Sequence, residues 1–245
     1  MYKRQLLAIL FVGAGRVLEV AWGDVFTNSS QAVVFLKGFL NPEWSYLPEL
    51  IDPMIDTLLM SLAGTFIGVV LAIPAAFLGT YLVTRNYFVT VIFRAFFSLI
   101  RTIPNLLLAA IFVAIVGIGE LTGVLTIAVF TFGMVSQLIF GSIETIERGP
   151  IEANESIGAT RFQLALTAVW PQVKDAIYGY ALYAFEVNVR ASAVLGYVGA
   201  GGIGVMLNSA LSFFQFGRVS LIILMILLMI FITNAISKYI RREVL

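Results

Sequence analysis

The stretch ERGPIEANESIGATRFQLALTAVWP, residues 147–171, separates two long apolar segments and has the punctuation of two short helices. Pro150 falls in the first turn of the first helix, where its missing amide removes no hydrogen bond, and Gly158 is placed to end that helix. Thr160 and Gln163 form a capping box that begins the second helix. The stretch therefore predicts a helix, a glycine turn and a second helix, and not a plain connector.

The composition of the whole chain excludes a soluble globular domain. Its 245 residues are 60% hydrophobic and 12% charged, and the mean hydropathy is +0.98, whereas a soluble domain has about 45–50% apolar and about 25% charged residues. The net charge of +1 gives no reason to expect a nucleic-acid partner. Because Cys and His are absent, disulfides, thiolate nucleophiles and the commonest zinc sites are excluded.

Long apolar windows determine the fold class. A helix of about 20 apolar residues crosses a bilayer core about 30 Å thick. Such windows predict an all-α polytopic membrane protein with six transmembrane helices, at 5–22, 56–79, 90–117, 121–143, 172–196 and 219–238. We expect the second short helix to end at Trp170 and Pro171 to begin the fifth span. The first window could instead be a signal peptide, but residues 10–23 lack a convincing cleavage site, so we expect an anchor helix.

Lysine and arginine predict the orientation, because short cytoplasmic loops carry an excess of both. With the N-terminus inside, nine basic residues fall on the cytoplasmic side: Lys3, Arg4, Arg85, Arg148, Arg161, Lys174, Lys238, Arg241 and Arg242. The other side keeps Lys37 and Arg218 and collects acidic residues: Asp24, Glu43, Glu49, Asp52, Asp56 and Glu120. We therefore expect both termini in the cytoplasm, with residues 1–55 forming the anchor helix and an outer interfacial segment.

Two local features bear on how the spans are shaped and packed. Pro74 and Pro104 lie inside predicted spans, where each removes a helix hydrogen bond and predicts a kink. Gly64 and Gly68 form a G-x-x-x-G pattern, which permits close contact between membrane helices.

The loop at 147–171 resembles the signature loop of ABC-importer permeases, in which Glu-Ala-Ala is followed by Gly and then by an apolar-x-Leu-Pro ending. Four positions match this pattern: Glu152, Ala153, Gly158 and Pro171. Three positions depart from it: Asn154 replaces the second Ala, Ala168 the usual Ile and Trp170 the usual Leu. The loop also lies before the penultimate helix on the positive side, where that family places its coupling helix.

The resemblance covers roughly residues 55–245. The stretches LIRTIPNLLLAAIFVAIVGIG (99–119) and FEVNVRASAVLGYVGAGGIG (185–204), together with a closing helix that carries basic residues, are similar in order to the phosphonate-importer permease subunit. The methionine-importer permease is similar in the Arg-x-Ile-Pro stretch, the loop and the glycine run. The family resemblance is therefore firmer for the fold than for the solute.

This resemblance implies a type I ABC importer permease fold, with residues 56–245 as the permease core and 147–171 as the cytoplasmic coupling loop. Coupling to the ATPase would fall on Glu152, Ala153, Gly158, Ala159 and Pro171. It implies a multi-pass protein of a prokaryotic cytoplasmic (inner) membrane, partnered by a second copy of itself, two ABC ATPase subunits and a periplasmic or surface-tethered substrate-binding protein. The cargo would be phosphonate or a related phosphorus oxyanion, moved by alternating access.

Energy must come from a partner chain. The sequence contains no G-x-x-x-x-G-K-[ST] phosphate loop, so we expect it to bind no cofactor, with ATP and Mg held by the partner ATPase.

Ionisable side chains at membrane depth are costly and usually face a partner or a wet cavity. Glu186 and Arg190 are four apart on the fifth span and can meet on one helix face. They form either a self-neutralising pair or a substrate site near Asn188, in which Glu186 holds the Arg190 guanidinium against a passing oxyanion. Arg101 in the third span either snorkels to the inner surface or assists the exit of an anion.

The run GAGGIG at 199–204 satisfies the dinucleotide pattern G-x-G-x-x-G, but no strand precedes it. We expect a tight backbone turn that re-enters the membrane or lines the outer vestibule. The four glycines of this outer turn are Gly199, Gly201, Gly202 and Gly204.

Two other functional classes remain as alternatives. An ion-gradient-driven carrier would also use intramembrane Glu and Arg residues. An intramembrane aspartyl protease needs two buried Asp residues on facing helices, whereas the Asp residues here lie at the edges of the spans: Asp24, Asp52, Asp56 and Asp175. We therefore expect a transport subunit with no catalytic residues.

Overall fold

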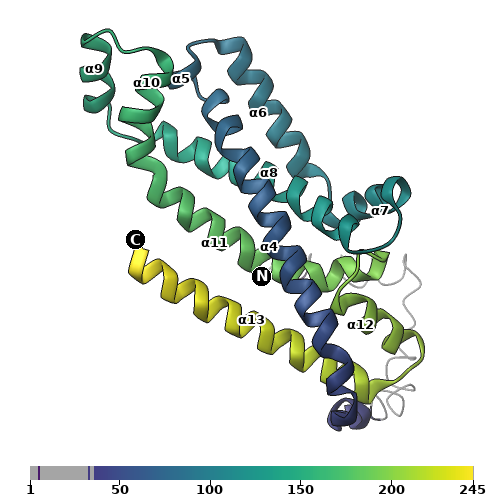
Figure 1. Ribbon diagram of the computed structural model, residues 1–245. Helices are drawn as coiled ribbons and strands as arrows, with labels where there is room; N and C mark the ends of the chain where they lie inside the picture. Colours follow the sequence, from purple (N-terminus) through teal and green to yellow (C-terminus); the bar gives the residue numbers. More distant parts are fainter. Residues whose placement is uncertain (1–4, 6–32, 34–35, 245) are drawn as a thin grey trace.

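The computed structural model describes residues 5, 33 and 36–244, and these residues form helices and loops without a strand (Figure 1). The helices, in chain order, are η1 (Trp44–Tyr46), α4 (Leu47–Leu78), α5 (Tyr81–Thr84), α6 (Tyr87–Thr102), α7 (Asn105–Val116), α8 (Glu120–Glu144), α9 (Gly149–Ser156), α10 (Arg161–Leu164), the π-helical turn η2 (Ala165–Val169), α11 (Trp170–Leu195), η3 (Gly196–Val198), α12 (Ile203–Ser212) and α13 (Phe216–Val244). The anchor helix predicted at 5–22 lies almost wholly outside the described residues.

Three helical stretches are long and apolar enough to cross a membrane: Trp44–Leu78, Glu120–Glu144 and Phe216–Glu243. Two bent helix pairs raise the number of candidate spans among the described residues to five, if each pair is one span. The all-helical prediction is confirmed. The windows predicted at 121–143 and 219–238 coincide with α8 and α13, whereas α4 begins well before residue 56.

The third predicted span, 90–117, is not one helix. It is broken between α6 and α7, whose axes differ by 91°. Ile103 is extended with ψ of 120°, and Pro104 follows as the N-cap of α7 with ψ of 139°. The proline ring disfavours helical backbone at the residue before it and has no amide to donate, so the chain turns here instead of bending gently.

The second short helix of the 147–171 loop also differs from the prediction. The chain is helical from Arg161 to Val198, so no break separates this helix from the fifth span. In a regular α-helix Pro171 would leave the Thr167 carbonyl unbonded and its ring would clash there. The wider π turn η2 precedes Pro171 and accommodates it.

The two glycines of the G-x-x-x-G pattern bring α4 directly against α8. A Cβ atom on Gly64 would lie 2.6 Å from Ile127 Cγ2, and one on Gly68 would lie 2.6 Å from Thr131 Cβ. Backbones this close give α4 and α8 a tight contact that any larger side chain would separate.

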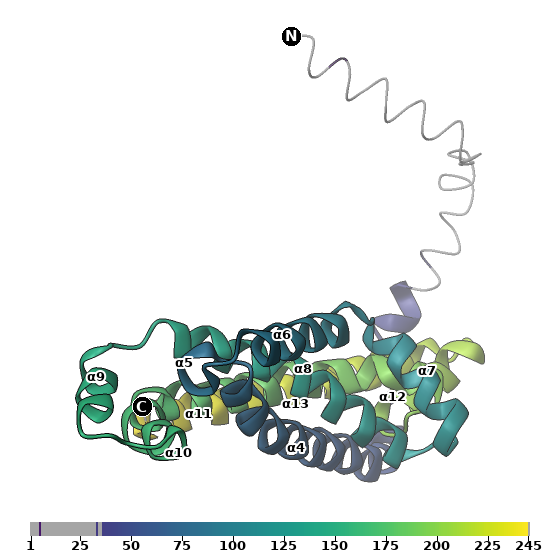
Figure 2. The ribbon, with the colours of Figure 1, turned by 90° about the horizontal axis from the view of Figure 1, so that it is seen from above.

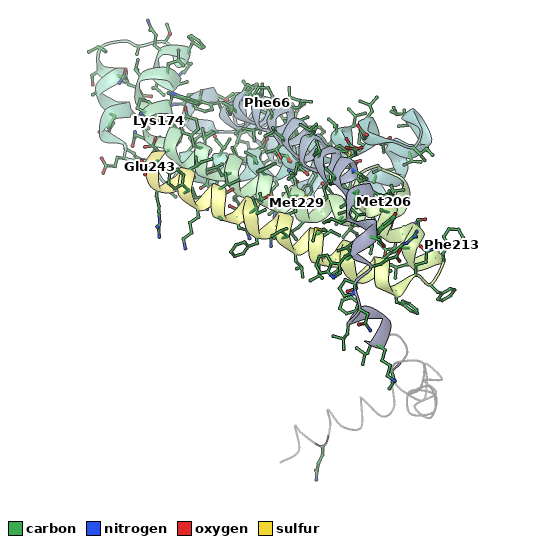
Figure 3. The ribbon with its side chains drawn as sticks, turned by 60° about the horizontal axis from the view of Figure 1, so that its bottom comes forward. Phe66, Lys174, Met206, Phe213, Met229 and Glu243 are labelled. Atoms are coloured by element: carbon green, nitrogen blue, oxygen red, sulfur yellow. The ribbon has the colours of Figure 1, made fainter. Side chains whose placement is uncertain are left out.

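Two views establish which segments share an end of the bundle. Figures 1 and 2 place α5, α9, α10 and the C-terminus at one end, and α7 and α12 at the other. In Figure 3, Lys174 of α11 and Glu243 of α13 lie near the first end, whereas Met206 and Phe213 lie near the second. The loop at 147–171 and the C-terminus therefore lie on the same side of the bundle, as the count of basic residues predicts.

Candidate functional site

The 147–171 loop projects from one end of the bundle (Figure 1), and its first part has the predicted helix start, glycine turn and capping box. Pro150 occupies the first turn of α9, and Gly158 follows that helix with φ of 75°, a value that favours glycine. The Thr160 amide donates to Gln163 Oε1 at 2.8 Å, and the Gln163 amide donates to Thr160 Oγ1 at 3.4 Å, so the capping box is confirmed.

The surface of this loop is open. Three residues predicted to couple with an ATPase are exposed: Glu152, Ala153 and Gly158. Two apolar side chains beside them project further, since Ile157 is 82% and Phe162 is 73% exposed. Pro171 is also exposed, and Ala159 is partly buried. The predicted coupling residues thus lie on a surface with uncovered apolar side chains.

One carboxylate holds the loop to the rest of the bundle. Glu155 on α9 forms an ion pair with Arg85, which follows α5. A second guanidinium, that of Arg161, lies 3.5 Å from the same carboxylate oxygen. The contact joins two segments far apart in sequence at the end of the molecule that carries the loop.

Arg101 lies beside a cavity of about 590 Å³ between α6, α8 and α11. Its guanidinium donates to Gln137 Oε1 on α8. Among the described residues, no carboxylate lies within ion-pair distance of it. The same cavity is lined by Ser142, Tyr180 and Tyr183. An uncompensated cation therefore faces a cavity with hydroxyl groups in its wall.

The register of α6 and α8 explains why Arg101 lacks a carboxylate. One heptad earlier on α6, Arg94 forms an ion pair with Glu144 at 2.7 Å and lies 4.0 Å above the centre of the Phe140 ring. Because the helices are antiparallel, one heptad forward on α6 corresponds to one heptad back on α8, which brings Arg101 to Gln137. This position is about 10 Å along α8 from Glu144. Arg101 is thus matched by the amide of Gln137, whereas Arg94 is matched by the carboxylate of Glu144.

A second cavity, of about 600 Å³, shares three wall residues with the first: Leu138, Tyr180 and Tyr183. The second cavity adds Asp175 and Arg241. Tyr180 and Ser142 are joined by a hydrogen bond of 2.6 Å between their hydroxyls. The two cavities thus lie side by side along α8 and α11. Both are lined by Tyr180 and Tyr183; the first also contains Arg101 and the second Arg241.

The expected pairing of Glu186 with Arg190 is not what the structure contains. The Glu186 carboxylate accepts a hydrogen bond of 3.0 Å from Arg241 on α13. Arg190 is exposed, and its Nε donates at 3.3 Å to the backbone oxygen of Glu186. Arg241, and not Arg190, is therefore the partner of the Glu186 carboxylate, because α13 packs against this part of α11. Arg190 is not among the residues that line the two cavities.

Asn188 lies in the interior of the helix bundle and is 0% exposed. Its Nδ2 donates at 2.7 Å to both Thr65 on α4 and Thr131 on α8. Its Oδ1 has no partner among the described residues. One turn further along α11, Ser192 is hydrogen-bonded to Ser61 at 2.7 Å. The predicted pathway residue therefore belongs to a polar contact between three helices.

The glycine run at 199–204 forms the predicted tight turn, and the chain bends by 46° before entering α12. Gly199, Gly201 and Gly202 have φ between 70° and 85°, a range that L side chains rarely adopt. A Cβ on Gly202 would lie 2.5 Å from Thr57 Oγ1, which accepts a 2.8 Å hydrogen bond from the amide of Ile203. A Cβ on Gly204 would lie 2.3 Å from the backbone oxygen of Ala193. The turn is packed against α4 and α11.

Several residues of the cavities carry no functional prediction from sequence, among them Gln137, Tyr180, Tyr183 and Arg241. The sequence does single out Gln137, because it is the only amide side chain in the apolar window 121–143. Its partner depends on the antiparallel register of α6 and α8, which no local pattern reveals. Arg241 counted only as a basic residue at the cytoplasmic end of the chain.

Comparison with known proteins places this arrangement in a family. Residues 64–245 match the family described as the binding-protein-dependent transport system inner membrane component. The chain is 38% identical over 249 residues to the phosphite transport system permease protein PtxC of Stutzerimonas stutzeri, with 98% of this chain and 90% of that protein covered. It is 33% identical over 193 residues to the phosphate-import permease protein PhnE of Mycolicibacterium smegmatis, with 79% of this chain and 36% of that protein covered.

The fold is similar to that of solved ABC transporters. A chain of the inward-facing MetNI methionine ABC transporter superposes with a TM-score of 0.73 at 22% identity, covering 82% of this chain and 98% of that chain. A second crystal form gives a TM-score of 0.69 at 20% identity, covering 80% of this chain and 96% of that chain. At this identity the likeness concerns the fold alone, which is that of a type I ABC importer permease. The chain belongs to the family of binding-protein-dependent transport system inner membrane components, the multi-pass permeases of ABC transporters.

Proposed function

We propose that this chain is the permease subunit of an ABC importer that moves phosphite, phosphonate or a related phosphorus oxyanion into the cytoplasm. The observation that carries the proposal is the Arg101 guanidinium, which is exposed in the last turn of α6 and borders a cavity without a compensating carboxylate among the described residues. The relatives named for phosphite and phosphate transport support the same solute class.

The chemistry of the cavity suits a tetrahedral oxyanion. A guanidinium offers planar donors that match two oxygens of such an anion. Tyr180 and Tyr183 supply hydroxyls in the same wall. The cation must be only partly satisfied for an anion to compete, and Gln137 leaves it so because an amide oxygen carries no formal charge.

The energy source is a separate ATPase. We infer that the exposed loop at 147–171 docks on that subunit through Glu152, Ala153 and the projecting Ile157, while Glu155 transmits movement to Arg85. Two copies of the chain would enclose one pathway, with two ATPases inside the cell and a substrate-binding protein outside it. The chain itself carries out no chemical reaction.

The topology follows from charge. We infer six transmembrane helices with both termini in the cytoplasm. Five are the candidate spans of the described residues, and the anchor helix predicted at 5–22 precedes them in the chain. Support comes from the nine basic residues assigned to the cytoplasmic side and from the common end of the bundle shared by the loop and the C-terminus (Figure 1).

Reconstitution tests this proposal against its alternatives. Vesicles would contain the permease and a partner ABC ATPase, with the substrate-binding protein added outside, and uptake of labelled phosphite, methylphosphonate and methionine would be followed with and without internal ATP. ATP-dependent uptake of a phosphorus oxyanion is expected. Uptake of methionine alone would indicate a different solute, and uptake by the permease alone on an ion gradient would indicate a carrier. Either result would refute the proposal.

A further inference from the structure

A third cavity, of about 630 Å³, lies away from the two described above, at the end of the bundle that carries the loop. It is open to the surface and is lined by residues of α4, α5, α10 and η2 and by Trp170, the first residue of α11. Its walls are apolar, and the Phe77 and Trp170 rings form part of them with their centres 6.5 Å apart. None of the residues named above for contact with the ATPase (Glu152, Ala153, Ile157) lines this space, and neither does Arg101.

One charged residue lines this cavity. Arg161 lies at its edge, and no carboxylate is among the residues that form the wall. The nearest carboxylate, Glu155, is 3.5 Å from Arg161 Nη1 and is hydrogen-bonded to Arg85. Two guanidinium groups thus share one carboxylate, and the three side chains together carry a net charge of +1.

The position of the cavity fits the boundary between lipid and water. Pro74 and Leu78 in its wall belong to the last turns of α4, which is apolar and long enough to span a membrane. Thr84 and Arg161 in the same wall lie beyond that helix, Thr84 at the end of the short helix α5 and Arg161 at the start of α10. Tryptophan is enriched at such boundaries, where its ring is apolar and its N–H remains in a polar layer.

We propose that this cavity binds one anionic phospholipid of the adjoining leaflet. An acyl chain lies against Phe77 and Trp170, and the phosphate of the headgroup pairs with Arg161. An amphipathic anion matches an apolar cavity with a single cation at its edge, because a free phosphate would leave the walls uncovered and a neutral lipid would leave the excess charge unmatched. The lipid would thereby join the membrane to the loop through Arg161 and Glu155.

Fluorescence quenching tests this proposal without a transport measurement. The chain has three tryptophans, so Trp22→Phe with Trp44→Phe leaves Trp170 as the only one. This variant is placed in phosphatidylcholine vesicles that contain either brominated phosphatidylglycerol or brominated phosphatidylcholine. We expect Trp170 to be quenched at an about fivefold lower content of the anionic lipid, which corresponds to about 1 kcal/mol for one basic residue near the surface.

Matched variants distinguish a specific lipid site at Arg161 from a general electrostatic attraction between the protein and anionic lipids. Arg161→Gln is expected to abolish the preference, Arg161→Lys to retain most of it, and Arg242→Gln, which removes a cation at the same end of the bundle, to leave it unchanged. Equal quenching by the two lipids would overturn the proposal, as would an equal loss in Arg242→Gln. Relief of quenching by inorganic phosphate at constant ionic strength would indicate a free-anion site and would also overturn it.

Discussion

Arg241 of α13 and Glu186 of α11 form an ion pair of 3.0 Å, with side chains 37% and 17% exposed. The pair joins the last helix of the chain to the helix that continues from the loop, and the Arg241 guanidinium also borders the cavity that contains Asp175. A charged contact therefore links α13 to the helix that continues from the loop, in addition to the apolar packing between them.

Glu186→Gln should lower the thermal unfolding temperature of the purified protein. Loss of one partner leaves a half-buried guanidinium uncompensated, at a cost of about 1–3 kcal/mol, between the values for exposed and buried pairs. The double variant with Arg241→Gln should recover part of this loss because no charge is then left unpaired. Arg190→Gln serves as the control. A loss in that variant equal to the loss in Glu186→Gln would contradict the assigned pairing.

Gln137→Glu should suppress oxyanion uptake while preserving the fold. The new carboxylate would pair with Arg101 and compete with the substrate, and loss of a charge-assisted hydrogen bond of about 1.5–3 kcal/mol corresponds to roughly 10- to 100-fold weaker transport. Initial rates of uptake in vesicles measure the effect, with the unfolding temperature measured in parallel.

Glu144→Gln is the matched control for this prediction, because it removes the carboxylate from the equivalent position one heptad away, beside Arg94. It should lower stability slightly and leave uptake within about twofold of the unmodified protein. Full transport by Gln137→Glu would rule out Arg101 as an anion site.

Gly68→Ala should destabilise the contact between α4 and α8. The new methyl group would meet Thr131 Cβ at 2.6 Å and the Ala128 carbonyl at 2.7 Å, so the helices must separate. Overpacking of this kind costs about 1–3 kcal/mol. Gly141→Ala, with nothing within 4 Å of the new atom, should be neutral or stabilising by up to about 1 kcal/mol. Equal unfolding temperatures for the two variants would show that the contact is unimportant.

Asn188→Ala should reduce stability without changing solute selectivity. Removal of the amide breaks the bonds to Thr65 and Thr131, and one interhelical hydrogen bond in a membrane is worth about 0.6 kcal/mol, with an upper value of about 1.7 kcal/mol. Competition between phosphite and methylphosphonate for uptake gives the selectivity. A shift in that ratio at unchanged stability would instead support the pathway role expected from sequence.

Ile157→Asp should release the ATPase from the permease during co-purification. The side chain is 82% exposed in the isolated chain, and a charge placed there would be buried without a partner in the complex, which is strongly unfavourable. Ile157→Leu should retain the ATPase because it preserves volume and apolar character. Unchanged recovery of the ATPase with the Asp variant would show that the contact lies elsewhere.

Sequence reasoning succeeded where the determinant is local. The capping box of Thr160 and Gln163 needs only residues three apart, and the turn at Gly158 needs only a missing side chain. It failed at Trp170, where a helix end was expected, because a π turn can absorb the conflict that Pro171 creates. It also failed to foresee a sharp break at Pro104, since a proline alone predicts a kink without fixing its angle.

The sequence by itself determined that the chain is an all-helical membrane protein and that its loop carries the pattern of an ABC permease, because hydropathy and motif spacing are properties of short segments. Only the tertiary structure decided that Glu186 pairs with Arg241, that Asn188 is buried and that Arg101 meets an amide. These outcomes depend on the crossing and register of helices distant in sequence. Close contacts such as the one at Gly68 set that geometry, and no periodicity within a single helix encodes it.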